Sequence, residues 1–120
     1  MMERKLLIVE DECLLALSLE TNLRELGYVL CGPVVSGEEA IKRTKIENPD
    51  VVLMDIHLAG EMDGIEAARQ IRLFSNALII FITGFSETGL KNRAMELNPA
   101  AYLIKPIEAL QVQSILNSIH

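Results

Sequence analysis

The sequence has no tryptophan, three phenylalanines, two tyrosines and only two cysteines, Cys13 and Cys31. With so few aromatic residues, the core of the protein must be built from aliphatic side chains. The two cysteines fall in different predicted elements, with no CxxC pair and no neighbouring histidine, which argues against a zinc site. We therefore expect both thiols to be reduced and buried.

Positive charge and long hydrophobic runs are also scarce. Eleven Lys and Arg residues stand against seventeen Asp and Glu residues, and the net charge of −6 argues against direct binding to nucleic-acid phosphates. The longest wholly apolar run, residues 77–82, is far shorter than the ~20 residues of a membrane-spanning helix. The first residues do not form a signal peptide. We therefore expect a cytoplasmic protein without membrane contact.

Five short apolar runs recur along the 120 residues, a length that suits one domain covering residues 1–120. They predict strands at Lys5–Val9, Val29–Val34, Val51–Met54, Leu78–Ile82 and Ala101–Ile104. The first, third and fourth runs are almost continuously apolar, which is typical of parallel strands that are buried on both faces.

Helical spacing of apolar residues, together with cap residues, fills the stretches between and after these runs. Helices are predicted at Leu15–Leu26, Ser36–Glu47, Asp63–Ile71, Leu90–Leu97 (after a polar entry at residues 86–89) and Pro106–Ile119. This alternation predicts an α/β protein with a flavodoxin-like, doubly wound, five-stranded parallel sheet of order 2-1-3-4-5 and helices on both faces.

Polar residues directly follow four of the predicted strands. They are Glu10, Asp11, Glu12, Asp55, Thr83 and Lys105. Each of these residues, taken alone, could have a purely structural role, such as a helix cap, a turn hydroxyl or a surface charge. In a doubly wound fold, however, ligands bind at the carboxyl ends of the strands, and all of these residues share that edge. Their joint placement indicates a functional site.

The chemistry of this set points to phosphoryl transfer with a divalent cation. Carboxylates that converge from neighbouring strands repel one another by about 4 kcal/mol per pair at 4 Å and an effective dielectric near 20, so a cation must offset them. Ligands that are all oxygen favour Mg²⁺ over zinc. A metal ion, the Lys105 ammonium group and the Thr83 hydroxyl can bind three phosphoryl oxygens around Asp55, with Asp55 as the nucleophile.

The sequence resembles the receiver domains of two-component response regulators, including the chemotaxis-protein-like receivers, over essentially its whole length. The motifs that carry the resemblance are Leu7–Glu12, Val51–Asp55, Met62–Ala67, Ile82–Gly84 and Tyr102–Pro106. Any one of them alone would be weak, whereas the set is specific.

The resemblance implies that Asp55 accepts a phosphoryl group from the phosphohistidine of a sensor histidine kinase or a phosphotransfer protein. It implies a Mg²⁺ site that includes Asp55 and has Asp11 as a direct ligand. Glu10 would assist through water, and His57 would contribute its backbone carbonyl. The domain would be a signalling module rather than an enzyme, catalysing at most its own phosphorylation and dephosphorylation.

The resemblance also implies a switch. Lys105 would pair with the phosphoryl group, and the Lys105–Pro106 bond would be cis, although most X–Pro bonds are trans. Thr83 would bond to the phosphoryl group and Tyr102 would change rotamer with it, while Gly84 leaves room for phosphoryl access. The surface of the fourth helix, fifth strand and fifth helix would then dock an output domain or a second receiver.

One segment departs from the family pattern. Residues 58–62 lack the usual proline and are one residue longer than is common, so we expect a looser loop in which Gly60 and Glu61 alter access to the site.

There are three alternatives to the interpretation as a phosphorylated receiver domain. A haloacid dehalogenase would need a second aspartate where His57 stands. A flavodoxin or nucleotide-binding module would need phosphate-binding amides where the chain has Glu10, Asp11 and Glu12. A receiver that acts as a phosphorylation-independent interaction module remains the alternative within the family.

Overall fold

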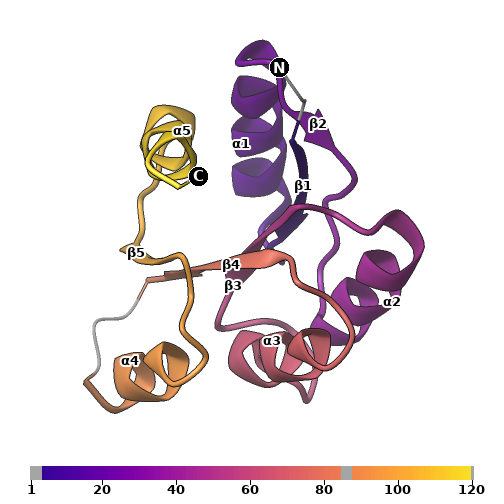
Figure 1. The fold of residues 1–120 in the computed structure, drawn as a ribbon, viewed down its shortest axis with the longest axis vertical. Coiled ribbons are helices and arrows are strands. Elements are labelled where there is room, and N and C mark those ends of the chain that lie inside the picture. Colours follow the sequence, from indigo (N-terminus) through magenta and orange to yellow (C-terminus); the bar gives the residue numbers. More distant parts are fainter. Residues whose placement is uncertain (1–3, 85–87, 120) are drawn as a thin grey trace.

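The protein forms a five-stranded sheet in which all strand pairs are parallel, in the order β2-β1-β3-β4-β5 (Figure 1). The structure, a computed structural model, describes residues 4–84 and 88–119. The strands are β1 (Lys5–Val9), β2 (Val29–Leu30), β3 (Val51–Asp55), β4 (Leu78–Thr83) and β5 (Ala101–Ile104). The predicted fold class and strand order are therefore confirmed.

Helices cover both faces of this sheet. They are α1 (Cys13–Glu25), α2 (Gly37–Glu47), α3 (Gly64–Arg72), α4 (Thr88–Met95) and α5 (Ala109–Asn117). Helices α1 and α5 lie on one face and α2, α3 and α4 on the other (Figure 1). Because side chains alternate along β1, Leu6 and Ile8 pack on the α1 side, whereas Leu7 and Val9 pack on the opposite side. Within the described residues, none of the helices is long and apolar enough to cross a membrane.

The two predicted helix caps are confirmed. The Ser36 hydroxyl accepts a hydrogen bond from the Glu39 N–H at 3.1 Å and opens α2. The Asp63 carboxylate accepts one from the Glu66 N–H at 2.8 Å and opens α3. These side chains satisfy N–H groups that a helix start otherwise leaves unpaired.

Strand β2 is shorter than predicted, ending at Leu30 instead of Val34, with one isolated bridge between Val34 and Val9. The reason lies in Pro33, which has no N–H for the sheet. Strands β3 and β4 each run one residue further than predicted, so Asp55 and Thr83 are the last residues of strands rather than the first residues of loops.

The buried face of α1 differs from the predicted leucine stripe. Leu15 is 48% exposed, and the buried positions are Ala16, Glu20 and Leu23. The Oε1 atom of Glu20 accepts a hydrogen bond from the Arg24 guanidinium at 2.8 Å, whereas its buried Oε2 atom has no hydrogen-bond partner among the described residues. Cys13, the first residue of α1, is exposed and Cys31 is half-buried, so the prediction that both are buried was wrong, although both thiols are free.

Helix α5 begins at Ala109, with Glu108 at its N-cap, and not at Pro106. Lys105 and Pro106 form a bend instead, because the Lys105 side chain reaches back into the sheet edge before the chain turns into the helix. The predicted polar entry to α4 lies partly outside the described residues, at positions 86 and 87.

Candidate functional site

The position of Asp55 is fixed by the close approach of α3 to the end of β3. The Gly64 N–H donates a hydrogen bond to the Ile56 carbonyl at 2.8 Å. A Cβ atom on residue 64 would lie 2.1 Å from the Asp55 carbonyl oxygen, so only glycine fits. The sequence showed Asp63-Gly64 as a helix start, but it did not reveal that Gly64 also holds the backbone of Asp55 in place.

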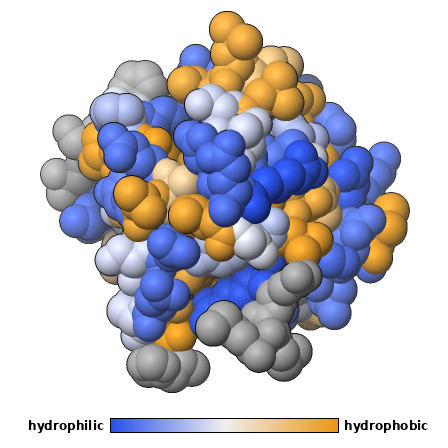
Figure 2. Space-filling model, turned by 90° about the horizontal axis from the view of Figure 1, so that it is seen from above, coloured by the Kyte–Doolittle hydropathy of each residue, from blue (hydrophilic) through white to orange (hydrophobic). Residues whose placement is uncertain are grey.

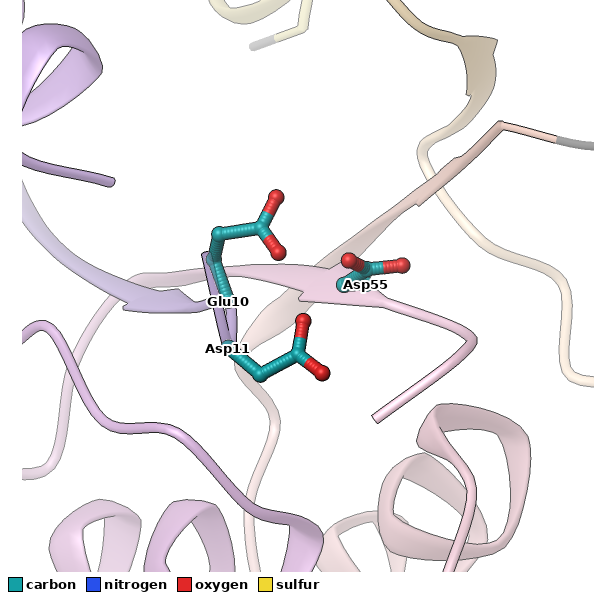
Figure 3. Close-up of side chains that lie close together, drawn as sticks. All are labelled: Glu10, Asp11 and Asp55. Atoms are coloured by element: carbon teal, nitrogen blue, oxygen red, sulfur yellow. The ribbon is translucent and has the colours of Figure 1, made fainter. Parts of the chain in front are cut away.

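Three carboxylates converge at the carboxyl edge of the sheet. Glu10, Asp11 and Asp55 each offer one oxygen, and these atoms all lie within 4.8 Å of one another. Figure 3 shows the side chains of Glu10 and Asp11 pointing toward Asp55 from the end of β1. Glu10 and Asp55 are 8% and 3% exposed, whereas Asp11 faces solvent. These oxygens are therefore open to a cation that approaches from the solvent side.

The side chain of Lys105, the residue after β5, reaches the same carboxylates. Its Nζ atom lies 2.8 Å from Asp55 Oδ2 and 2.8 Å from Glu10 Oε1. Glu12, which also belongs to the predicted set at this edge, lies 3.8 Å from the same ammonium group, a contact that the sequence did not predict. The structure thus brings together Glu10, Asp11, Asp55 and Lys105, all of which were predicted to share the site.

The charges of this cluster act on one another. Burial raises the pKa of Glu10, and the adjacent Asp55 carboxylate raises it further, while Lys105 opposes both effects. Burial alone would lower the pKa of Lys105, but its hydrogen bonds to Asp55 and Glu10 outweigh burial and raise the pKa above the ordinary lysine value. Lys105 therefore stays charged. A further cation nearby would stabilise the ionised form of Glu10.

The backbone of His57 lies next to the Asp55 carboxylate. Its backbone N–H donates to Asp55 Oδ1 at 3.2 Å, so the backbone at residue 57 borders the acidic cluster. Its side chain is exposed. This placement is compatible with a backbone role for His57 and gives its imidazole no position in the cluster.

Thr83 and Tyr102 lie on neighbouring strands beside the site. Thr83 is fully buried at the end of β4, and its carbonyl accepts a hydrogen bond from the Lys105 N–H at 2.8 Å. Tyr102 is half-buried on β5, where the Lys91 ammonium group lies 5.8 Å from its ring centroid. The Lys105–Pro106 bond is cis, the conformation that the resemblance implies, and Gly32–Pro33 is cis as well.

The segment that departs from the family pattern is anchored at both ends. Leu58 and Met62 pack against the core on the α3 side. Between them, Gly60 has a φ of 95°, a conformation that glycine adopts without strain, and Glu61 is exposed. The extra residue is therefore accommodated as an outward turn beside the site.

The site opens into a cleft of about 840 Å³ that runs between α1 and the start of α5. Its lining combines Asp55 and Lys105 at one end with apolar side chains such as Leu15, Leu19 and Ile107. Exposed apolar residues occur near it on both helices, with Leu14 at 84% and Leu110 at 64%. Figure 2 shows one face of the molecule, on which hydrophobic residues lie between hydrophilic ones.

The donor chemistry of the cluster fits a hard divalent cation. All three side chains offer oxygen, and two of the three carboxylates are almost fully buried with a single ammonium group to neutralise them. Oxygen ligands in this number, with room for water on the exposed side of Asp11, are those that Mg²⁺ prefers. The doubly wound sheet, with this acidic cluster and a lysine at its carboxyl edge, defines a class of small α/β domain in which oxygen ligands suited to a cation lie beside an ammonium group.

Comparison with known proteins agrees with this class. The family model of the response regulator receiver domain matches residues 6–117. The transcriptional regulatory protein PdtaR of Mycobacterium tuberculosis is 40% identical over 103 residues, which cover 86% of this chain and 50% of PdtaR. The chain thus spans about half the length of this curated relative.

Solved structures give the same result. The signal receiver domain of a modulated diguanylate cyclase from Desulfovibrio desulfuricans is 37% identical, with a TM-score of 0.90 and coverage of 98% of this chain and 93% of that one. The receiver domain of a Pseudomonas aeruginosa sensor histidine kinase, described with a magnesium ion coordinated in its active site cleft, is 30% identical, with a TM-score of 0.84 and coverage of 98% and 97%. This chain belongs to the response regulator receiver domain family of two-component systems.

Proposed function

We propose that this domain receives a phosphoryl group on Asp55 from a phosphohistidine, with Mg²⁺ bound at Glu10, Asp11 and Asp55. The observation that carries the proposal is the Lys105 ammonium group, 2.8 Å from Asp55 Oδ2, beside three convergent carboxylates. Membership of the receiver family supports the assignment, since receiver domains are signalling domains and bind Mg²⁺ at an acidic site.

The residues divide the chemistry among them. Asp55 supplies the oxygen that bonds to phosphorus while the donor's P–N bond breaks and the histidine leaves. Asp11, Asp55 and the His57 carbonyl would hold the metal directly, and Glu10 would support it through water. Bound Mg²⁺ neutralises charge on the transferring group. Lys105, the residue after β5, and the hydroxyl of Thr83, the last residue of β4, would bind phosphoryl oxygens.

Mg²⁺ is expected to stabilise the unmodified protein, because the cation relieves repulsion among Glu10, Asp11 and Asp55 in the folded state only. At ten times its dissociation constant it adds about 1.4 kcal/mol to the free energy of unfolding. This corresponds to a rise of roughly 5 °C in Tm for a domain of this size. Thermal melts in EDTA and in Mg²⁺, at matched ionic strength, measure the shift.

Two variants test whether the rise in Tm comes from Mg²⁺ bound at the acidic cluster. Asp11→Asn removes a proposed direct ligand and should abolish most of the Mg²⁺-dependent rise. Glu96→Gln removes an exposed carboxylate from the chain beyond α4 and should retain the whole rise. If wild-type protein melts at the same temperature with and without Mg²⁺, the metal site is wrong.

Phosphorylation is proposed to act on the switch face, which we define as α4, β5 and α5. The modified Asp55 carries about one additional negative charge and strong acceptor oxygens. If the Thr83 hydroxyl moves to bond to them, space opens beside β5 and Tyr102 turns inward to fill it. The cation–π contact between Lys91 and the Tyr102 ring would then be lost, and α4 would shift.

Amide hydrogen exchange with and without Mg²⁺–fluoroberyllate tests this switch. Exchange rates should change severalfold in the segments Leu90–Leu97 and Tyr102–Gln113, and α2 should not respond. Thr83→Val keeps the shape of the threonine but lacks its hydroxyl, so this variant should still bind fluoroberyllate and lose the response of the switch face. Changes that remain confined to the loops around Asp55 in wild-type protein would count against the proposal.

The proposal also assigns partners to two surfaces. The cleft beside Lys105, with exposed Leu14 and Leu110 nearby, would receive the sensor histidine kinase or phosphotransfer protein, because it leads directly to Asp55. The switch face would dock an output domain or a second receiver, since exposed Met95 and Ile104 offer apolar contacts there.

A further inference from the structure

Lys105 has three carboxylate partners, which differ in distance and in exposure. Its Nζ atom lies 2.8 Å from Asp55 Oδ2 and from Glu10 Oε1, and 3.8 Å from Glu12 Oε1. The side chains of Asp55 and Glu10 are almost fully buried, whereas that of Glu12 is 64% exposed. No other carboxylate in residues 4–84 and 88–119 forms an ion pair with this ammonium group. Glu12 is therefore the partner of Lys105 on the solvent side of the cluster.

The start of α1 does not account for the Glu12 side chain. Glu12 is the N-cap residue of α1, a position that favours the shorter side chains of Ser, Thr, Asp and Asn, and its side chain makes no cap hydrogen bond. Its backbone N–H donates to Glu10 Oε2 at 3.2 Å, which fixes the chain at this point beside the acidic cluster. Within the described part of the chain, the contact with Lys105 is the one ion pair that the Glu12 side chain makes.

The two buried carboxylates have both of their oxygens engaged. Glu10 Oε2 accepts the Glu12 N–H, and Glu10 Oε1 contacts the Lys105 ammonium group. Asp55 Oδ1 accepts the His57 N–H, and Asp55 Oδ2 contacts the same ammonium group. A divalent cation at this cluster would need oxygens that Lys105 contacts, and like charges held a few ångström apart repel each other strongly. The ammonium group must then move outward, which is the side on which Glu12 lies.

We propose that Glu12 is a positioning residue that holds the Lys105 ammonium group on the solvent side of the site while a metal ion occupies the acidic cluster. The inference rests on the proposed function and deepens it. Held by Glu12, the ammonium group stays beside Asp55, where phosphoryl oxygens would arrive. Without this carboxylate, the displaced lysine side chain would extend into solvent and would have to return before it could bind them. Glu12 acts in this way only through Lys105.

Acylation of lysine side chains, measured at each residue by peptide mass spectrometry, reports directly on this contact. An ion-paired ammonium group holds its proton more tightly than a free one and therefore reacts more slowly. In EDTA, Lys105 should react at nearly the same rate in wild-type protein and in Glu12→Gln, because Asp55 and Glu10 hold it. In saturating Mg²⁺, it should react about two- to fivefold faster in Glu12→Gln, the range for an exposed ion pair. Lys42, an exposed residue of α2, is the internal reference.

Mg²⁺ affinity, measured by calorimetric titration, separates a contact with Lys105 from a general effect of charge. Glu12→Gln should weaken Mg²⁺ binding about two- to fivefold. In a Lys105→Met background, the same substitution should change the affinity less than about 1.5-fold, because the group through which Glu12 acts is gone. Glu12→Asp keeps the charge and is a better N-cap, but its shorter side chain loses the contact. It should therefore behave as Glu12→Gln does.

Glu108→Gln is the matched control. Glu108 is also an exposed N-cap residue without a side-chain cap hydrogen bond, at the start of α5, and it lines the same cleft as Lys105. It is not among the ion-pair partners of Lys105 in the described residues. Because solvent and salt screen its charge, this variant should match wild-type protein in both measurements.

Three results would overturn the role of Glu12. They are equal acylation of Lys105 in wild-type protein and Glu12→Gln when Mg²⁺ is bound, a loss of Mg²⁺ affinity in Glu12→Gln that persists with Lys105→Met, and a Glu12→Asp protein that behaves as wild type. The second and third results would reduce Glu12 to a general negative charge near the cluster. A wild-type protein that binds no Mg²⁺ in the titration would instead refute the proposed metal site, and the role of Glu12 with it.

Discussion

Asp55→Asn is expected to lose all phosphoryl incorporation while keeping the fold. The substituted side chain has nearly the same shape, and its oxygen can still accept the His57 N–H that Asp55 Oδ1 accepts at 3.2 Å. It lacks, however, the nucleophilic carboxylate that would bond to phosphorus. With acetyl phosphate and Mg²⁺, the intact mass of wild-type protein should rise by one phosphoryl group, and that of the variant should not change.

The same variant should make the metal-free protein more stable, because one of the converging negative charges is removed while Lys105 keeps its contact with Glu10. Asp63→Asn is the matched control: asparagine still caps α3, and phosphorylation should proceed as in wild type. If Asp55→Asn still accepts one stoichiometric phosphoryl group, the assignment of Asp55 is wrong.

Gly64→Ala is expected to destabilise the protein by about 3 kcal/mol or more, the upper range for forcing atoms into a packed site. The new methyl group would lie 2.1 Å from the Asp55 carbonyl oxygen and 2.9 Å from the Ile56 Cα atom, and both belong to backbone that cannot rotate away. Moving this backbone also displaces the Asp55 carboxylate. The rate of phosphorylation by acetyl phosphate should therefore fall in whatever fraction remains folded.

Urea unfolding measures the stability change, and Gly89→Ala provides a control of opposite sign. Gly89 is exposed in α4 with nothing within 4 Å of its added Cβ atom, so alanine should stabilise the helix by about 0.5–1 kcal/mol. A Gly64→Ala protein as stable as wild type would show that α3 does not hold Asp55 in the way described.

Most of the fold could be predicted because its signals are local. Apolar runs identified the strands, and Ser36 and Asp63 marked two helix starts through cap chemistry that depends on residues only three positions away. The errors occurred where distant contacts override local pattern. Leu15 fits a helical stripe, yet it lies at the edge of the buried face, and Pro106 suits a helix start, yet the chain bends there because Lys105 reaches toward Asp55.

The residues of the acidic cluster could likewise be predicted, since parallel strands bring their carboxyl ends to one edge. The supporting contacts could not be predicted from the sequence. Nothing in the order of residues shows that Gly64 touches the Asp55 backbone, that Glu12 approaches Lys105, or that Arg72 of α3 donates to the Leu97 carbonyl beyond α4. Each depends on how elements far apart in the chain pack together.

Asp55 is proposed to carry the phosphoryl group in a Mg²⁺-dependent reaction. Peptide mass spectrometry after reaction with acetyl phosphate, in Mg²⁺ and in EDTA, maps that group most directly. We expect modification of Asp55 alone, and only when Mg²⁺ is present. A phosphoryl group on Glu10, Asp11 or His57, or modification of Asp55 that proceeds equally well in EDTA, would contradict it.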